Sequence, residues 1–292
     1  MNKKWVMISI FFLVATLFMV PRSVFADAAV GDTIITLGEN LTEEQKQSIL
    51  NEMNADENAT IITVSNAEEH KYLGNYISKS QIGSRAISSS KITLKEKGSG
   101  IQVKTNNINW VTEEMYANAL ITAGVKDADV YVTAPFSVSG TAGLTGLIKA
   151  YEETTNQTIP EEQKQVANEE MVRTAELSDR IGADQASELM TRIKEEIAEN
   201  PPATKEDLRS LIQRIAQDLG ITLTEEELNQ LVELFNKMKD LNIDWDQVKT
   251  QLTDLKDNLN EVLNKEETQN FLEKIIDWFI QLIDKIKAFF SK

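Results

Sequence analysis

The sequence predicts an α+β fold, in which a mixed α/β domain with a small sheet precedes an all-helical domain. Runs of β-branched residues alternate with helical stretches as far as Tyr151, and no strand pattern follows it. Beyond that point apolar residues recur at helical spacing, most clearly in residues 208–219 and 228–238. We therefore expect an α+β domain at residues 27–156 and a helical domain at residues 157–292.

The first 26 residues have the pattern of a secretory signal peptide. Two lysines precede an apolar run at residues 5–20, and small residues at Val24 and Ala26 suit the signal peptidase. An uncleaved membrane anchor is the alternative, but an apolar run of about 16 residues is shorter than the ~20 that span a bilayer. We expect cleavage after Ala26, although adjacent small residues offer a second register.

In the first domain, residues 33–37 and 60–64 are predicted strands, because both are short β-branched runs. Between them a helix is expected to begin at Thr42, which has capping-box spacing to Gln45. Residues 87–96 and 100–105 are predicted to be two strands of a hairpin, joined by a turn at residues 97–99.

A helix is then expected from Thr112 to about Ala123, where Gly124 is placed to end it. Residues 129–134 are predicted to form the next strand. Helix-linked strands beside a hairpin indicate an α+β sheet with some parallel pairs. In the second domain, helix starts are predicted where a cap residue precedes acidic or amide groups, at residues 158–161, 204–207, 224–227 and 244–247.

Three glycines follow the strand that ends near Ala134, in the pattern G-x-x-G-x-x-G. This spacing matches neither the dinucleotide fingerprint nor the P-loop. A helix beginning near residue 139 would still present free N–H groups to an anion. We therefore retain a candidate ligand or anion loop, although close packing of the glycine face is the favoured interpretation and simple loop flexibility a further one. The candidate residues are Ser139, Gly140, Thr141, Gly143 and Gly146.

The amino-acid composition excludes several kinds of catalytic and metal site. The chain has no cysteine, which excludes a thiol nucleophile and a cysteine zinc site, and His70 is its one histidine, too few for a multi-histidine zinc site. A formal charge of −16 disfavours nucleic acid as a partner. Residues 240–244 match the first positions of a calcium loop, but Trp245 stands where that loop needs glycine. No cofactor, metal or catalytic residue is predicted.

Residues 268–290 are predicted to form an amphipathic helix that carries too many charges to span a bilayer. Packing against the helical core is the favoured interpretation of its apolar face. A membrane surface and self-association are the alternatives. The candidate membrane or partner face consists of Phe271, Leu272, Ile275, Ile276, Phe279, Leu282, Ile283, Ile286, Phe289 and Phe290.

Three segments carry a resemblance that extends over nearly the whole mature chain. They are "GENLTEEQKQSIL" at 38–50, the stretch from "ISSSKITLKEKGSG" to "GLTGLIKAYE" at 87–152, and "LGITLTEEELNQLVELFNKMKDLNIDWDQVKTQL" at 219–252. In these the chain resembles the YpuA-like family of uncharacterised exported proteins of Gram-positive bacteria, a domain of unknown function. The resemblance implies an exported, envelope-facing protein, and it brings no activity, cofactor or catalytic residue.

The sequence thus favours a secreted, non-enzymatic binding or interaction protein at the extracellular face of the cell envelope. The partner and the ligand both stay open: a membrane surface and another envelope component are the candidates for the partner, and nucleic acid is not. One alternative is a hydrolase of an envelope polymer that uses carboxylates, Ser139 or Thr141. The other is a membrane-surface-active protein that acts through the helix at residues 268–290.

Overall fold

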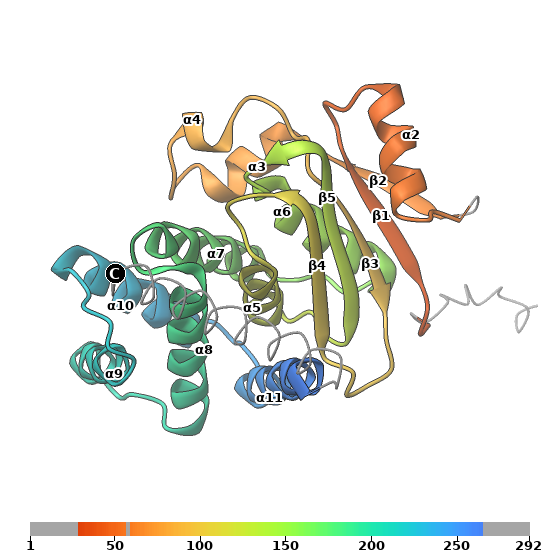
Figure 1. The fold of residues 1–292 in the computed structure, drawn as a ribbon. Helices are drawn as coiled ribbons and strands as arrows, with labels where there is room; N and C mark the ends of the chain where they lie inside the picture. Colours follow the sequence, from red (N-terminus) through yellow and green to blue (C-terminus); the bar gives the residue numbers. More distant parts are fainter. Residues whose placement is uncertain (1–28, 57–58, 265–292) are drawn as a thin grey trace, which may run out of the picture.

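The computed structural model describes residues 29–56 and 59–264 (Figure 1). A five-stranded mixed sheet with flanking helices forms the N-terminal half, and the described part of the C-terminal half is helical. The predicted α+β fold is therefore confirmed. The signal peptide and the amphipathic helix at residues 268–290 lie outside the described residues, and both stay predictions.

The sheet has the strand order β2-β1-β3-β5-β4. β1 pairs parallel with β2, β4 pairs parallel with β5, and the central strand β3 is antiparallel to both β1 and β5. Parallel pairs across helical crossovers were predicted in general terms, and they form here at the two edges of the sheet. The strands are β1 Thr33–Gly38, β2 Thr60–Val64, β3 Ser89–Leu94, β4 Ile101–Ile108 and β5 Ala128–Val138.

The predicted hairpin of residues 87–96 and 100–105 is wrong. β3 and β4 are both present, but β5 lies between them and pairs with each. The connection is held by Asp127, whose Oδ1 accepts hydrogen bonds from the amides of Gly98 and Gly100 at 2.9 and 3.0 Å. A turn of the length that closes a hairpin therefore bridges one intervening strand here, because the start of β5 supplies its hydrogen-bond partners.

The helices of the N-terminal half begin at polar caps, except the helix Thr141–Thr155, which follows Gly140 and has no side-chain cap. The side chains of Thr42, Ser65, Ser78 and Thr112 accept hydrogen bonds from first-turn amides, which satisfies donors that lack a partner inside the helix. Gly124 ends its helix at a φ of 85°, as predicted. These helices are α2 Glu43–Glu52, α3 Asn66–Leu73, α4 Lys79–Ile82, α5 Glu113–Ala123 and α6 Thr141–Thr155.

Four of the five described helices of the C-terminal half begin close to where the sequence predicts. The first of them begins at Glu161 after Pro160, without the side-chain cap expected at Thr158, and the helix that begins at Ala183 was not predicted. Thr204 and Thr224 form capping boxes, and Asp244 caps the last described helix through Gln247 N at 3.0 Å. That hydrogen bond explains Asp244 without a calcium loop. The helices are α7 Glu161–Ile181, α8 Ala183–Glu199, α9 Lys205–Asp218, α10 Glu225–Asp240 and α11 Trp245–Asn264.

Helices cover the two faces of the sheet unequally. α2 packs on one face, where Ile49 and Met53 meet Ile35 and Leu37 in a small cluster. α5 and α6 lie on the other face, and α7 and α8 pack beyond them (Figure 1). The larger apolar cluster continues from the sheet as far as Leu252 of α11. The two predicted domains therefore share a core, and their boundary as independent units stays a prediction.

A buried ion pair between α7 and α8 also forms hydrogen bonds with α5 of the N-terminal half. Lys194 Nζ of α8 lies 2.8 Å from Glu170 Oε1 of α7, and each side chain is only 1% exposed. Thr122 of α5 donates a hydrogen bond to Glu170, and Lys194 donates one to the carbonyl oxygen of Asn118 at 3.0 Å. Burial lowers the pKa of Lys194, which the neighbouring Glu170 carboxylate partly offsets.

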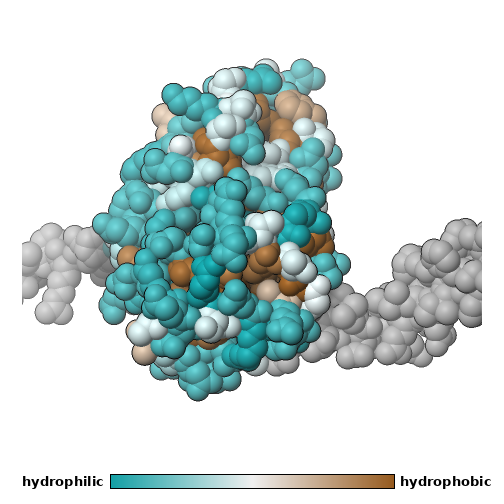
Figure 2. Space-filling model, turned by 90° about the vertical axis from the view of Figure 1, so that its left-hand side faces the viewer, coloured by the Kyte–Doolittle hydropathy of each residue, from teal (hydrophilic) through white to brown (hydrophobic). Residues whose placement is uncertain are grey.

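The outer face of the helical layer is mainly hydrophilic, with apolar atoms visible in small patches (Figure 2). Within residues 29–56 and 59–264, no helix combines the length and apolar character that crossing a bilayer requires.

Candidate functional site

The glycine stretch lies at the start of α6, packed against Tyr116 of α5. A Cβ atom on Gly140 would lie 2.4 Å from Tyr116 Oη, and one on Gly143 would lie 2.7 Å from the same atom. Tyr116 Oη donates a hydrogen bond to the carbonyl oxygen of Gly140 at 2.5 Å. Gly140 also has a φ of 94°, a conformation that favours glycine.

Gly146, the third glycine, packs against the sheet instead of against Tyr116. Thr36 Oγ1 of β1 donates a hydrogen bond to the carbonyl oxygen of Gly146 at 3.0 Å, and a Cβ on Gly146 would lie 3.0 Å from Thr36 Cγ2. Each of the three glycines thus lets a neighbouring side chain approach the α6 backbone, as the packing interpretation expects. A ligand role for this loop stays a prediction.

Thr141, the first residue of α6, contacts a buried carboxyl group. Its Oγ1 donates a hydrogen bond to Glu69 Oε1 of α3 at 3.0 Å, and Asn66 Nδ2 donates to Glu69 Oε2 at 3.1 Å. Burial raises the pKa of Glu69 to about 7, against the lowering effect of these two hydrogen bonds. Ser139 Oγ lies 3.3 Å from Thr141 Oγ1, so the two predicted hydroxyls do lie together.

His70 does not join these hydroxyls. Its Nε2 hydrogen bonds to the carbonyl oxygen of Gly83 at 3.1 Å, and none of the described hydrogen bonds links it to Ser139 or Thr141. Since the chain has one histidine, a Ser-His-Asp arrangement would have to use it. Glu69 and Thr141 are 1% and 3% exposed, and neither lines the cavities described below.

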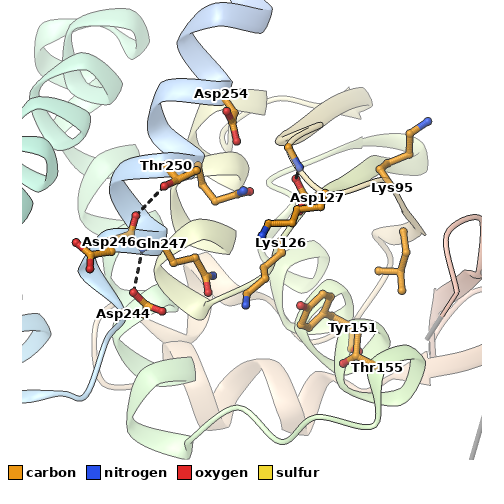
Figure 3. A pocket seen from close by; sticks show the side chains of 14 residues that line it. Lys95, Lys126, Asp127, Tyr151, Thr155, Asp244, Asp246, Gln247, Thr250 and Asp254 are labelled. Carbon is orange, nitrogen blue, oxygen red and sulfur yellow. Dashed lines mark hydrogen bonds between the residues drawn. The ribbon is translucent and has the colours of Figure 1, made fainter. Parts of the chain in front are cut away.

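A groove of about 680 Å³, which we call the α11 groove, is lined by polar and charged side chains (Figure 3). Four parts of the chain form it: the β3–β4 connection, the loop before β5, the end of α6, and α11. Its lining residues are Leu94, Lys95, Lys97, Gly98, Lys126, Asp127, Tyr151, Thr155, Asp244, Asp246, Gln247, Thr250, Gln251 and Asp254.

The loops contribute the positive side of the α11 groove. Lys97 and Lys126 are exposed, and neither ammonium group has an ion pair within the described part of the chain. Figure 3 shows the Lys126 side chain extending between Gln247 and Tyr151. Burial raises the pKa of Tyr151, although a backbone hydrogen bond from Lys126 opposes the shift. Tyr151 is therefore a neutral hydroxyl at the base of the groove.

α11 contributes acceptors on the opposite side. Asp244 caps the helix and Asp246 lies in its first turn, while Gln247 Nε2 donates a hydrogen bond to the carbonyl oxygen of Gly124 at 3.2 Å. That bond fixes α11 against the end of α5. Gln251 is only 4% exposed, and its Oε1 has no hydrogen-bond donor in the described structure. A buried amide oxygen without a donor is costly, which marks it as a place for a ligand N–H.

A second hollow, of about 470 Å³, lies on the sheet face beside α2. Glu52 Oε1 at its edge accepts hydrogen bonds from Asn106, Tyr131 and Thr133 at 2.9, 2.7 and 2.7 Å. Partial burial alone would raise the pKa of Glu52, but these three donors outweigh it and lower the pKa. Hydrogen bonds from the strands thus hold Glu52 as a carboxylate, and these three partners account for its lowered pKa.

Metal binding finds no support in this part of the molecule. Across residues 29–56 and 59–264, no three acidic or histidine side chains are grouped so that they could hold a metal ion.

Comparison with known proteins places the chain in a family. A family described as "Protein of unknown function (DUF1002)" matches residues 37–255. The chain belongs to this family. It is also 54% identical over 292 residues to the uncharacterized protein YpuA of Bacillus subtilis (strain 168), a match that covers 100% of both chains. No solved structure was found to match it.

The DUF1002 match includes every residue that lines the α11 groove, from Leu94 to Asp254. The predicted signal peptide and the predicted helix at residues 268–290 lie outside it, although the YpuA match spans them. The groove therefore belongs to the part of the chain that defines the family.

Sequence reasoning missed both Glu69 and the α11 groove. Glu69 carried a usable signal, because it lies four residues before the buried Leu73 and so on the inward side of α3. The sequence holds no comparable signal for the groove, because Lys126, Tyr151 and Gln251 come from separate elements that only the fold brings together.

Proposed function

We propose that this DUF1002 protein is exported and acts at the cell envelope as a non-enzymatic binding protein, which holds its ligand in the α11 groove. The observation that carries the proposal is the unpartnered Oε1 of Gln251, buried in the wall of a groove that also presents Lys97 and Lys126. The signal-peptide pattern of residues 1–26 supports the compartment.

The volume and lining of the groove fit the binding of a small molecule. About 680 Å³ is within the range of small-molecule sites. The lining offers ammonium, carboxylate and amide groups that can form hydrogen bonds with a polar ligand. The predicted membrane or partner face at residues 268–290 would keep the protein near the envelope.

A hydrolase remains a second candidate because of one observation. Glu69 has a pKa raised to about 7 and accepts a hydrogen bond from Thr141, which is the arrangement of a base beside a hydroxyl nucleophile. Against it, both side chains are buried and neither lines a described cavity. A substrate would have to displace α3 or α6 to reach them, so binding is favoured.

The test uses the protein purified from cells that express the full chain. Fractionation first shows whether it leaves the cytoplasm. Hydrogen exchange is then compared with and without the low-molecular-weight fraction of a cell-envelope digest. We expect slower exchange in residues 94–98, 125–128 and 244–252. Cytoplasmic retention, or unchanged exchange in all three segments, would refute the proposal.

A further inference from the structure

We propose that the ligand of the α11 groove is a short zwitterionic peptide, bound through its carboxylate, its ammonium group and its backbone N–H groups. This inference rests on the proposed binding function and adds the chemical class of the ligand. The lysines of the groove come from the loops at the end of the sheet, and three of its four aspartates, Asp244, Asp246 and Asp254, come from α11 and the residue that caps it.

The cationic side fits a carboxylate. Lys95 is already paired, with its Nζ 3.0 Å from Asp129 Oδ2. Asp127 is also occupied, since its Oδ1 accepts from two turn amides. The Lys97 and Lys126 ammonium groups are left without an ion pair in the described structure. Two loop cations that line the same groove attract an anionic group and can donate several hydrogen bonds to it.

The α11 side fits nitrogen donors. Gln251 Oε1 is a buried acceptor that needs an N–H group, and Asp246 has no ion pair within residues 29–56 and 59–264. Asp244 uses Oδ1 to cap α11, which leaves its other carboxylate oxygen for a ligand. An amide N–H at Gln251 and an ammonium group near Asp244 would satisfy both kinds of acceptor.

The walls of the groove do not neutralise each other. No ion pair of 4 Å or less closes it between Lys126 and Asp244, although Figure 3 shows both at its lower end. Unpaired opposite charges across a gap favour a ligand that carries both signs. A polyanion would meet the aspartates of α11, and a purely apolar ligand would leave Gln251 Oε1 without a donor.

The experiment uses trialanine as the probe, in four forms that differ only at their ends. Free trialanine carries both charges, N-acetyl-trialanine lacks the ammonium group, trialanine amide lacks the carboxylate, and the doubly blocked peptide lacks both. Affinity is measured by calorimetry with the full chain, and hydrogen exchange locates the peptide. We expect each blocked end to weaken binding about tenfold, the usual effect of losing one charged hydrogen bond.

Two variants and a matched control assign the contacts. Lys126→Met should weaken free trialanine about tenfold yet leave trialanine amide unchanged, because the amide has no carboxylate to lose. Gln251→Leu should weaken all four peptides, since each has backbone N–H groups. Lys79→Met is the control, because Lys79 is exposed on α4 and lines none of the described cavities.

The outcomes separate the ligand class from the binding function. Equal affinity for all four peptides, with protection in the groove, would overturn the zwitterionic class and leave the binding function standing. Protection by the envelope digest without any peptide binding would do the same. If neither the digest nor any peptide protects the groove, both proposals fail. The inference would be supported if blocking either end of trialanine weakened its affinity, and if Lys126→Met removed only the part of the affinity that depends on the free carboxylate.

Discussion

The buried carboxyl group of Glu69 allows a quantitative test of the α3–α6 contact. In the folded state its pKa is about 7, against 4.5 for an unperturbed glutamate, because burial penalises the carboxylate. The folded protein therefore binds the proton more tightly than the unfolded chain does. The stability linked to this proton is fully present below pH 4.5 and is lost as the pH rises through about 7.

Glu69→Gln removes the ionisation while keeping a neutral side chain of similar shape. Its carbonyl oxygen can accept from Thr141, and Asn66 can turn its own oxygen toward the new amide. A shift from 4.5 to about 7 corresponds to about 3 kcal/mol of linked free energy. We expect the variant to match the wild type near pH 4.5 and to be more stable by up to about 3 kcal/mol at pH 8.

The assay is urea unfolding followed by far-UV circular dichroism at several pH values between 4.5 and 8. Glu52→Gln is the control. Because hydrogen bonds lower the pKa of Glu52, it stays ionised in both states over most of this range, and its difference from the wild type should stay nearly constant. A Glu69→Gln difference that does not grow with pH would refute the raised pKa.

Three further variants probe other contacts, with urea unfolding as the measurement for the first two. Lys194→Met should cost about 3–5 kcal/mol because it leaves a buried carboxylate unpaired, and adding Glu170→Gln should restore most of the loss; additive losses would contradict the buried pair. Gly143→Ala should cost about 1–2 kcal/mol because its Cβ would lie 2.7 Å from a buried tyrosine oxygen, and more than Gly146→Ala, whose nearest atom would be 3.0 Å away. Deletion of residues 268–292 should release the protein from the envelope fraction of cells, and an unchanged distribution on fractionation would count against attachment through that segment.

Local signals explain what the sequence predicts well. Thr42, Thr112 and Thr204 each cap a helix as expected, because a cap depends on residues within three positions of it. Gly124 likewise ends α5 through its own backbone conformation. The close approach at Gly140 was a favoured interpretation, but its partner Tyr116 could not be named from spacing alone.

Long-range partners explain what the sequence does not predict. The connection at residues 97–99 has hairpin length, and only the amide hydrogen bonds to Asp127 show why β5 enters between its strands. The same holds for the candidate site. From the sequence, Gln251 is an ordinary polar residue of an amphipathic helix. Only the fold buries its side chain and places it in a groove that is also lined by residues of the N-terminal half, such as Lys126.

The insertion of β5 between β3 and β4 also constrains the order in which the chain can fold. β4 leaves the ribosome, or a translocation channel, before its partner strand does, and its neighbour in sequence is not its neighbour in the sheet. β4 (residues 101–108) therefore cannot form its native pairing until β5 (residues 128–138) is available. Any early hairpin between β3 and β4 is non-native and must open before the sheet can close. A chain of this topology gains from partners that keep it unpaired until β5 is available, because its most local strand pairing is non-native.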